Sequence, residues 1–471
     1  MLFSSTVFIF LFLPIVLGLH FLIARNYRNL FILIASLFFY AWGEHMLVLL
    51  MMGSICVNYI LGNIVSEFQE KERPMQAKAA LILGVAINLS VLGYYKYIHF
   101  LIDTLSQIGL NLDIDVSNVT LPIGISFFTF QSISYLIDVY RKTVVGQKSL
   151  INLGMYISLF PQLIAGPIVR YADISKEIVN RNISSSLFKI GITRFIGGFA
   201  KKILIANNVG LIADQVFAIA PSELSTSLSW IGIICYSLQI YYDFSGYSDM
   251  AIGLGKILGF NFKENFEHPY ISKSIREFWR RWHISFSTWI RDYLYIPLGG
   301  SRGGEGTRLK ASYGAMLISG LWHGASWTLV LWGAYHATLL AGYKYIGKWI
   351  PREIRKANWM APFSVSLMFL FTVAGWMIFR ETSIGRIGYY LSLSPLEGTP
   401  EQWLAASLML GITLLSAIPL IIALIIEKFL VPKIENKPLF LPLQTTSWAI
   451  LLCGILLMKR DISQDFIYFQ F

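Results

Sequence analysis

The stretch SYGAMLISGLWHGASWTLVLWGAYHATLL, residues 312–340, decides the fold that we expect for the rest of the chain. It is apolar and long enough to lie in a membrane, but Gly320, Gly324 and Gly333 interrupt it. Non-helical backbone at membrane depth is tolerated only where it is buried in protein or lines a wet cavity. His323 lies at the centre of the run, and an ionisable residue there is a functional candidate. The alternative is that His323 is a neutral side chain hydrogen-bonded between helices.

The composition indicates a membrane protein that crosses the bilayer many times. Of the 471 residues, 55% are hydrophobic and 14% are charged, whereas soluble globular domains carry about 25% charged residues. The formal charge of +11 does not indicate nucleic-acid binding, because excess Lys and Arg in a membrane chain belong first to cytoplasmic loops. The cysteines stand alone in apolar runs, so we expect small core residues and neither disulfides nor a metal site. They are Cys56, Cys235 and Cys453.

Apolar segments of spanning length recur along the chain. They lie at about 5–23, 29–43, 46–65, 79–101, 119–140, 203–220, 229–255, 360–380, 404–427 and 440–458. Two further pairs, 149–166 with 185–200 and 311–322 with 325–342, are short or broken. The sequence therefore predicts an all-α polytopic membrane protein with about ten full transmembrane helices and additional re-entrant or broken helices.

The distribution of basic residues orients these segments. Lys and Arg cluster in alternate loops, which marks those loops as cytoplasmic. The loops 102–118, 214–228 and 392–402 contain neither residue type, so we expect them outside the cell. Both chain ends then lie outside. No repeat or linker divides the sequence, and we expect one integral-membrane domain, 1–471, around a central cavity.

The cytoplasmic stretch 256–310 mixes aromatic side chains with arginines. This pattern is typical of an amphipathic helix at the membrane interface, where rings lie at headgroup depth and guanidinium groups meet phosphates. A basic funnel for a phosphate-rich acyl donor such as coenzyme A would need the same residues. His283 lies in this stretch, 40 positions before His323. The candidate donor-binding residues are Arg276, Arg280, Arg281 and Arg291.

Two carboxylates, Asp243 and Asp249, lie in YYDFSGYSDM at 241–250 among aromatic and small residues. Buried carboxylates in a membrane are costly unless they are paired. In one interpretation they orient a histidine or bind sugar hydroxyls. In the other they are structural partners of arginines such as Arg276 or Arg291.

Several long motifs cover the chain from residue 1 to about residue 380. They are MLFSSTVFIFLFLP at 1–14, LPIGISFFTFQSISYLIDVYR at 121–141, LFPQLIAGPIVR at 159–170, YYDFSGYSDMAIGLGKILGFNFKENFEHPYIS at 241–272, EFWRRWHISFSTWIRDYLYIPLGG at 277–300 and GLWHGASWTLVLWGAYH at 320–336. Together they resemble the membrane-bound O-acyltransferase (MBOAT) family. Within it they resemble the bacterial polysaccharide O-acetyltransferase branch, whose members O-acetylate alginate, peptidoglycan or other cell-wall polymers.

This resemblance implies acyl transfer in a tunnel across the bacterial cytoplasmic membrane, with an essential histidine and a second polar residue, His or Asn, upstream. By motif, His323 matches the essential position and His283 the upstream one. Trp322, beside His323, becomes a substrate-binding candidate. The resemblance implies acetyl-CoA as acetyl donor and no bound cofactor. The implied partners are an extracellular membrane-anchored SGNH-type acetyltransferase, a cell-envelope polysaccharide and membrane lipids.

The chemistry fits a histidine. A hydroxyl acceptor loses its proton as it attacks a thioester, and imidazole, with an ordinary pKa of about 6.5, accepts protons at neutral pH. We therefore expect His323 to act as general base, or as general acid in the reverse direction. His283 either orients the donor or assists the proton transfer. A broken helix offers free backbone amides to the oxyanion of the tetrahedral intermediate.

The tail 459–471, KRDISQDFIYFQF, ends in aromatic and apolar residues and is expected to dock rather than to remain disordered. It resembles the C-terminal motif of the small membrane peptide that accompanies the D-alanyl transfer proteins of teichoic-acid modification. By that match Tyr468 is an acyl-relay candidate, since a phenol ester keeps part of the transfer potential of a thioester. The alternative is a packing plug or a partner-docking strand.

The sequence thus predicts a membrane O-acetyltransferase that moves acetyl across the membrane for O-acetylation of an exported cell-wall polymer or exopolysaccharide. One alternative keeps the fold and transfers D-alanine or another acyl group. The other is a transporter or flippase, which would also use a broken midplane helix and buried charges.

Overall fold

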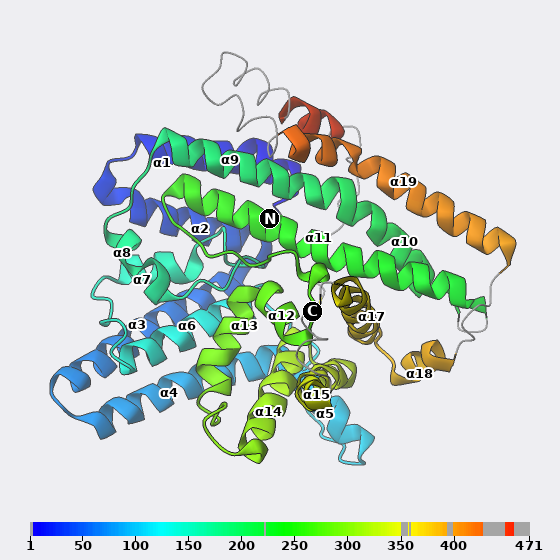
Figure 1. The fold of residues 1–471 in the computed structure, drawn as a ribbon. Coiled ribbons are helices and arrows are strands. Elements are labelled where there is room, and N and C mark those ends of the chain that lie inside the picture. The colour runs from blue at the N-terminus through cyan, green and yellow to red at the C-terminus, as the bar shows by residue number, and fades with distance from the viewer. Residues whose placement is uncertain are drawn as a thin grey trace. The chain divides into compact units, whose positions relative to one another are not determined.

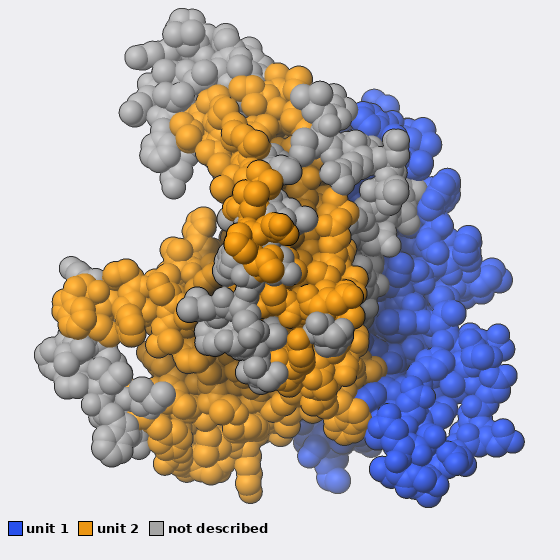
Figure 2. All heavy atoms as spheres, turned by 90° about the vertical axis from the view of Figure 1, so that its right-hand side faces the viewer, with its two compact units in different colours: residues 1–191, 254–263 blue, residues 192–253, 264–471 orange. Residues whose placement is uncertain are grey.

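The computed structural model describes residues 3–220, 223–349, 357, 359–392, 399–426 and 448–455, and within these ranges all regular elements are helices (Figure 1). Contacts between Cα atoms divide the chain into two compact units, coloured apart in Figure 2. Unit 1 comprises residues 1–191 and 254–263, and unit 2 comprises residues 192–253 and 264–471. The single domain over 1–471 stays a prediction.

Unit 1 is a helical bundle around α6 (Ile125–Tyr140), whose side chains are buried almost throughout, polar ones included. A helix that is enclosed on all sides belongs to the core of a large or membrane-embedded protein. Its neighbours are α3 (Val48–Glu70), α4 (Pro74–Leu92), α7 (Leu150–Ser158) and α8 (Tyr171–Val179). The other helices of the unit are α1 (Leu13–Leu22), α2 (Arg28–Glu44) and α5 (Ile98–Gln107).

Unit 2 begins inside α9 (Ser185–Ala200), which continues through a π-helical turn, Lys201–Ala206, into α10 (Asn207–Phe217). This long helical run lies beside α11 (Thr226–Leu258) (Figure 1). The approach is so close that a Cβ on Gly198 would lie 2.5 Å from the carbonyl oxygen of Gly246. Further helices are α12 (Ile275–Arg281), α13 (Ile284–Ile290), α14 (Glu305–His323), α15 (Trp327–Trp349), α17 (Met360–Arg380), α18 (Ile384–Ser392) and α19 (Pro400–Ile425), and residues 448–455 are also helical.

The membrane character of the chain is visible in its helices. Within the described residues, 4 helical stretches are long and apolar enough to cross a membrane: Arg25–Glu70, Pro74–Gln107, Ser185–Phe217 and Met360–Arg380. The prediction of an all-α chain with several spans is therefore confirmed for these residues. The expected break in the pair 311–322 and 325–342 is confirmed too, because α14 ends at His323 and α15 begins at Trp327.

Two expectations need correction. The amphipathic helix expected within 256–310 is divided, because α12 and α13 are separated at Trp282 and His283, and α13 passes through a π-helical turn, Arg291–Tyr295, into turns. His283 has φ 43° and ψ 55°, a left-handed conformation that ends any α-helix. Of the cysteines only Cys235 is a core residue, whereas Cys56 and Cys453 are exposed.

Candidate functional site

His323 is the last residue of α14, and Gly324 ends that helix in an extended conformation. The side chain of Ser326 then accepts a hydrogen bond from the backbone N–H of Leu329 over 3.3 Å, as helix-capping residues do at the start of the following helix. The sequence Trp322–Ser326 therefore folds as the tip of a helical hairpin, with His323 at the tip.

Glycines hold the two arms of this hairpin together. A Cβ on Gly320 would lie 2.1 Å from the carbonyl oxygen of Leu329, and one on Gly333 would lie 2.4 Å from that of Met316. Real Cβ atoms do not come so close to backbone, so only glycine permits this approach. The interruptions noted in the sequence at Gly320 and Gly333 are thus packing contacts inside intact helices, and only Gly324 breaks the chain direction.

The imidazole of His323 is enclosed by aromatic rings and is 4% exposed. Its ring centroid lies 4.9 Å from that of Trp322, 5.2 Å from those of Trp332 and Phe379, and 5.4 Å from that of Phe286. These rings come from α13, α14, α15 and α17. The cage excludes bulk water, and electrostatic interactions inside such a site are strengthened.

His283 is also buried, between α12 and α13. Its Nδ1 lies 3.0 Å from Oδ1 of Asn265. The same oxygen accepts hydrogen bonds from the backbone N–H (3.2 Å) and the hydroxyl (2.8 Å) of Ser285, while the Asn265 amide nitrogen donates to the hydroxyl of Ser248 over 3.0 Å. An amide oxygen only accepts, so Nδ1 of His283 carries the proton and Nε2 is the basic nitrogen. Burial lowers the pKa of His283 well below its ordinary value, which keeps the ring neutral at pH 7.

Phe286 connects the two histidines. Its ring stacks on His283 with centroids 5.0 Å apart and on Trp322 with centroids 4.4 Å apart, and it also contacts His323. The structure therefore brings the predicted residues His283, Trp322 and His323 into one cluster.

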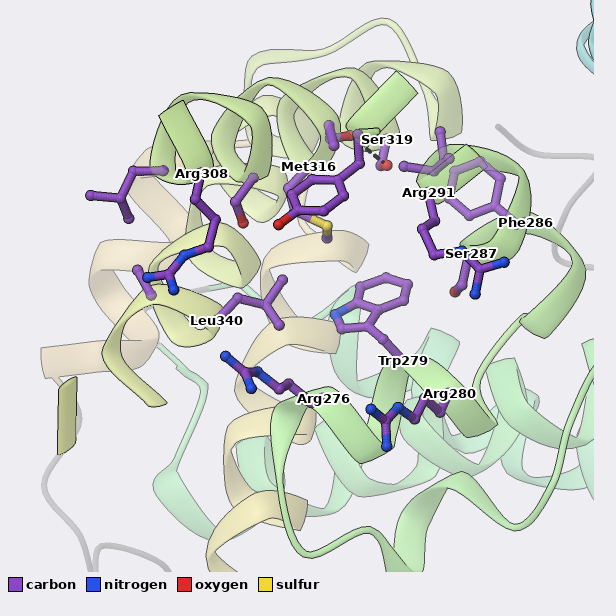
Figure 3. Close-up of a pocket in the computed structure, with 16 residues that line it drawn as sticks. Arg276, Trp279, Arg280, Phe286, Ser287, Arg291, Arg308, Met316, Ser319 and Leu340 are labelled. Carbon is purple, nitrogen blue, oxygen red and sulfur yellow. Dashed lines mark hydrogen bonds between the residues drawn. The ribbon is translucent and has the colours of Figure 1, made fainter. Parts of the chain in front are cut away.

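A cavity of about 380 Å³ lies next to this cluster, between α12, α13, α14 and α15 (Figure 3). Arg276, Arg280, Arg291 and Arg308 surround the indole of Trp279 in it. Within the described residues Arg276 and Arg280 form no ion pair, Arg291 pairs with Asp292 and Arg308 lies 3.7 Å from Glu305. The cavity is therefore positively charged. Its further lining residues include Phe286, Ser287, Met316, Ser319 and Leu340.

Phe286 belongs both to this cavity and to the cage of His323, and Ser319 of the cavity wall precedes His323 by one helical turn. The arginine-lined cavity is thus one aromatic ring away from the imidazole. Arg281 lies elsewhere: it pairs with Glu277 over 2.8 Å and lines a second hollow of about 520 Å³, which shares Arg276 and Arg280 with the first.

The two carboxylates of α11 face bases of α9 and of the turn that follows it. Asp243 forms a buried ion pair with Lys202 over 2.6 Å, with both side chains at most 3% exposed. Asp249 pairs with Arg194 over 2.9 Å and with Lys201 over 2.6 Å. The suggested partners Arg276 and Arg291 are therefore wrong, although Asp249 does pair with an arginine, Arg194. A role of these carboxylates in substrate binding stays a prediction.

Several residues of the site were not among the candidates from the sequence. Asn265 and Arg308 lie in the basic stretch 256–310, and Phe286 is one of its aromatic residues. His336 of α15 is 1% exposed, and its ring lies 4.6 Å from that of Trp332 and 5.2 Å from that of Trp279. Two signals could have found it, because it is an ionisable residue in an apolar run and lies at the end of the motif at 320–336. In the part of the chain that the structure describes, no 3 His, Cys, Asp or Glu side chains are grouped so that they could hold a metal ion.

Comparison with known proteins agrees with this geometry. Residues 141–380 match the model of the MBOAT, membrane-bound O-acyltransferase family. The chain belongs to this family. It is an O-acyltransferase and a multi-pass membrane protein, and the matched region contains His283, His323 and all the arginines of the cavity.

Similar proteins include probable alginate O-acetylases AlgI. That of Pseudomonas aeruginosa is 46% identical over 82% of this chain and 73% of its own length, and that of Pseudomonas syringae pv. tomato is 45% identical over the same shares. A peptidoglycan O-acetyltransferase of Helicobacter pylori is 33% identical over 82% of this chain and 78% of its own length. The last predicted site residue, Tyr468, lies outside the described residues.

Proposed function

We propose that this O-acyltransferase takes acetyl from cytoplasmic acetyl-CoA and delivers it across the membrane for O-acetylation of an exported cell-wall polymer or exopolysaccharide. The observation that carries this proposal is the place of His323, at the tip of a helical hairpin and one ring away from a cavity lined by four arginines. The names of the relatives, O-acetylases of alginate and peptidoglycan, support the acetyl group and the polysaccharide acceptor.

The cavity fits the donor. Coenzyme A carries phosphate groups, and arginine binds phosphate through short, charge-assisted and often paired hydrogen bonds. Arg276 and Arg280 form no ion pair among the described residues, and so offer uncompensated charge to such a ligand. The cavity volume of about 380 Å³ accommodates part of the donor, since ligand pockets measure roughly 300–1,000 Å³. The phosphates would lie at the arginines, and the thioester would extend past Phe286 towards His323.

In the transfer step the acceptor hydroxyl forms a C–O bond with the acetyl carbonyl carbon and the C–S bond of the thioester breaks. His323 accepts the hydroxyl proton and returns it to the leaving thiolate, so the imidazole is neutral again at the end. His283, held in one tautomer by Asn265, has its basic nitrogen at Nε2, and its ring stacks on Phe286. It orients the donor or assists the proton transfer.

The wider arrangement follows from the sequence and the family. We propose about ten crossings of the bacterial cytoplasmic membrane around a tunnel that contains His323. The stretch 256–310 faces the cytoplasm and the tail 459–471 the outside. In this arrangement Tyr468 accepts the acetyl group, and an extracellular membrane-anchored SGNH-type acetyltransferase passes it to the polymer.

Turnover of a labelled donor tests the proposal. Purified full-length protein in detergent is incubated with acetyl-labelled acetyl-CoA, and release of the label is followed for the wild type and for His323→Ala. We expect a loss of about 10²–10⁴-fold in the variant, as for removal of a general base. His99→Ala is the control, because His99 is an exposed histidine of unit 1.

The other outcomes separate the alternatives. Turnover with a D-alanyl carrier thioester and none with acetyl-CoA would establish the D-alanyl alternative. A transporter would leave both donors intact. Peptide mass spectrometry of the tail, for the wild type, Tyr468→Phe and His323→Ala, checks the relay. An acetyl group on the wild-type peptide that is absent from both variants supports the relay. Turnover that depends on His323 while the tail stays unmodified makes the tail a docking element.

A further inference from the structure

Three arginines of unit 1 come together without a carboxylate partner. Arg25 begins the 3-10 turn Arg25–Tyr27, Arg28 is the first residue of α2, and Arg181 follows α8. Their guanidinium groups donate only to neutral oxygens: Arg25 to Oδ1 of Asn180, Arg28 to the carbonyl oxygen of Ile23 over 3.2 Å, and Arg181 to Oδ1 of Asn29 over 2.6 Å. Among the described residues none of the three is in an ion pair. We call these three residues the arginine cluster.

The members of the arginine cluster repel one another. Burial and the charges of Arg28 and Arg25 together lower the pKa of Arg181 to about 10. Nε and Nη2 of Arg181 are buried and have no hydrogen-bond partner in the described structure, while its guanidinium carbon lies 4.7 Å from the centre of the Phe260 ring. A partly buried guanidinium with unused donors and like charges beside it is costly unless an anion completes the site.

His20 gives a second and independent indication. It lies in α1, is 0% exposed, and neither of its ring nitrogens has a hydrogen-bond partner in the described structure. Its ring interacts electrostatically with Arg181 and Arg28. A buried neutral imidazole offers one N–H donor, which an anion held by the arginines would accept.

The surroundings indicate which anion. Leu22 is 83% exposed, directly beyond His20, and Phe21 packs against Phe188 of α9 with ring centroids 5.9 Å apart while both rings remain more than one-third exposed. In a membrane protein such exposed apolar side chains face lipid chains. A basic group at the end of apolar helices on the cytoplasmic side is the arrangement that binds anionic headgroups.

We propose that the arginine cluster, with His20, binds the phosphate of an anionic phospholipid whose acyl chains lie along Phe21, Leu22 and Phe188. The site is separate from the acyl-transfer cluster in the sequence and belongs to unit 1 alone. It therefore stands or falls independently of the proposed function.

Lipid binding to the purified full-length protein tests this site. Wild-type protein in a neutral detergent is titrated with phosphatidylglycerol, phosphatidylcholine or inorganic phosphate, and bound lipid is counted by native mass spectrometry. We expect selective binding of phosphatidylglycerol, weakened about tenfold or more in Arg181→Gln, because one charge-assisted interaction with the phosphate is lost. Arg25→Gln is the second variant, since Arg25 is exposed and its replacement leaves folding intact.

Arg73→Gln is the matched control. Arg73 is an exposed arginine of the same unit, and its replacement removes the same charge without touching the cluster. Equal binding of phosphatidylglycerol by the wild type, Arg181→Gln and Arg25→Gln would overturn the site. Binding of inorganic phosphate that depends on Arg181, with no preference for phosphatidylglycerol, would overturn the assignment to a lipid.

Discussion

Nδ1 of His283 donates a hydrogen bond to Oδ1 of Asn265 over 3.0 Å, and this contact decides which nitrogen of the imidazole is basic. Burial keeps the pKa of His283 well below its ordinary value, so the wild-type ring is neutral throughout the physiological range. Asn265→Asp places a carboxylate at the same atom, which favours the imidazolium and raises this pKa. As the solution is acidified, the activity of Asn265→Asp should therefore begin to fall at a higher pH than the activity of the wild type.

The measurement is a pH profile of acetyl release for both proteins. Asn182→Asp, an exposed position in unit 1, is the control and should leave the profile unchanged. A profile of Asn265→Asp that coincides with that of the wild type would mean that the protonation state of His283 does not matter to the reaction.

Gly320 lies one turn before His323, against the backbone of α15. The Cβ that Gly320→Ala adds would lie 2.1 Å from the carbonyl oxygen of Leu329, so the two arms of the hairpin must move apart. We expect a loss of stability of roughly 1–3 kcal/mol, as for overpacking, together with a lower kcat because His323 moves. Gly306→Ala is the control in the same helix, since nothing lies within 4 Å of its added Cβ. Thermal inactivation in detergent measures the loss of stability, and turnover in detergent measures the loss of kcat, for both variants.

The cavity arginines are expected to affect donor binding rather than chemistry. Replacement of Arg276, Arg280 or Arg308 by Gln should raise KM for acetyl-CoA about tenfold, the cost of one charge-assisted hydrogen bond, with little change in kcat. Arg302→Gln removes an equal charge from an exposed turn outside the cavity and should leave KM unchanged. Effects of equal size at Arg302 would mean that only the overall charge of this region matters.

The Lys202–Asp243 pair is expected to be structural. Lys202→Met removes the cation that faces the buried carboxylate of Asp243 and should cost roughly 3–5 kcal/mol. Lys71→Met breaks an exposed pair with Glu67 and should leave the stability nearly unchanged. The double variant Lys202→Met/Asp243→Asn should recover most of the stability and the activity. Restored stability without activity would instead assign Asp243 to the substrate.

Phe286 separates the cavity from His323, so its size should matter. Phe286→Ala should lower stability by roughly 3–5 kcal/mol, as for other buried phenylalanines, and should raise the hydrolysis of acetyl-CoA relative to transfer because water gains access to the cage. Phe286→Leu retains most of the volume and is the matched control. An unchanged ratio of hydrolysis to transfer in Phe286→Ala would contradict a role as a barrier.

The hairpin and its histidine could be predicted from the sequence because the signals are local: an apolar run, a glycine break and one ionisable residue within a few positions of each other. The helical, membrane-spanning character follows from composition and hydropathy in the same way. The partners of Asp243 and Asp249 could not be predicted, because they lie on a neighbouring helical segment in space but more than 40 positions away in sequence. Chemical type alone suggested an arginine partner, which holds for Asp249 with Arg194, whereas Asp243 pairs with a lysine, Lys202.

The stretch 256–310 shows another limit. Its aromatic and basic pattern fits an amphipathic helix, yet His283 takes a left-handed conformation and divides it. In that conformation His283 contacts Asn265 and Phe286, and helix propensities of single residues do not include such contacts. Asn265 lies inside the motif at 241–272, but its role is visible only once its amide oxygen is seen to accept hydrogen bonds from both His283 and Ser285.

The contacts of Gly320 with Leu329 and of Gly333 with Met316 are made by main-chain atoms. The location of the backbone at His323 is therefore set by main-chain contacts between the two arms of the hairpin. Trp322, Trp332 and Phe379 form the walls around the imidazole, but they do not take part in these main-chain contacts. Under the proposed function, the cage rather than the hairpin is therefore the place to redesign acyl selectivity, because replacement of these rings leaves the main-chain contacts beside His323 in place.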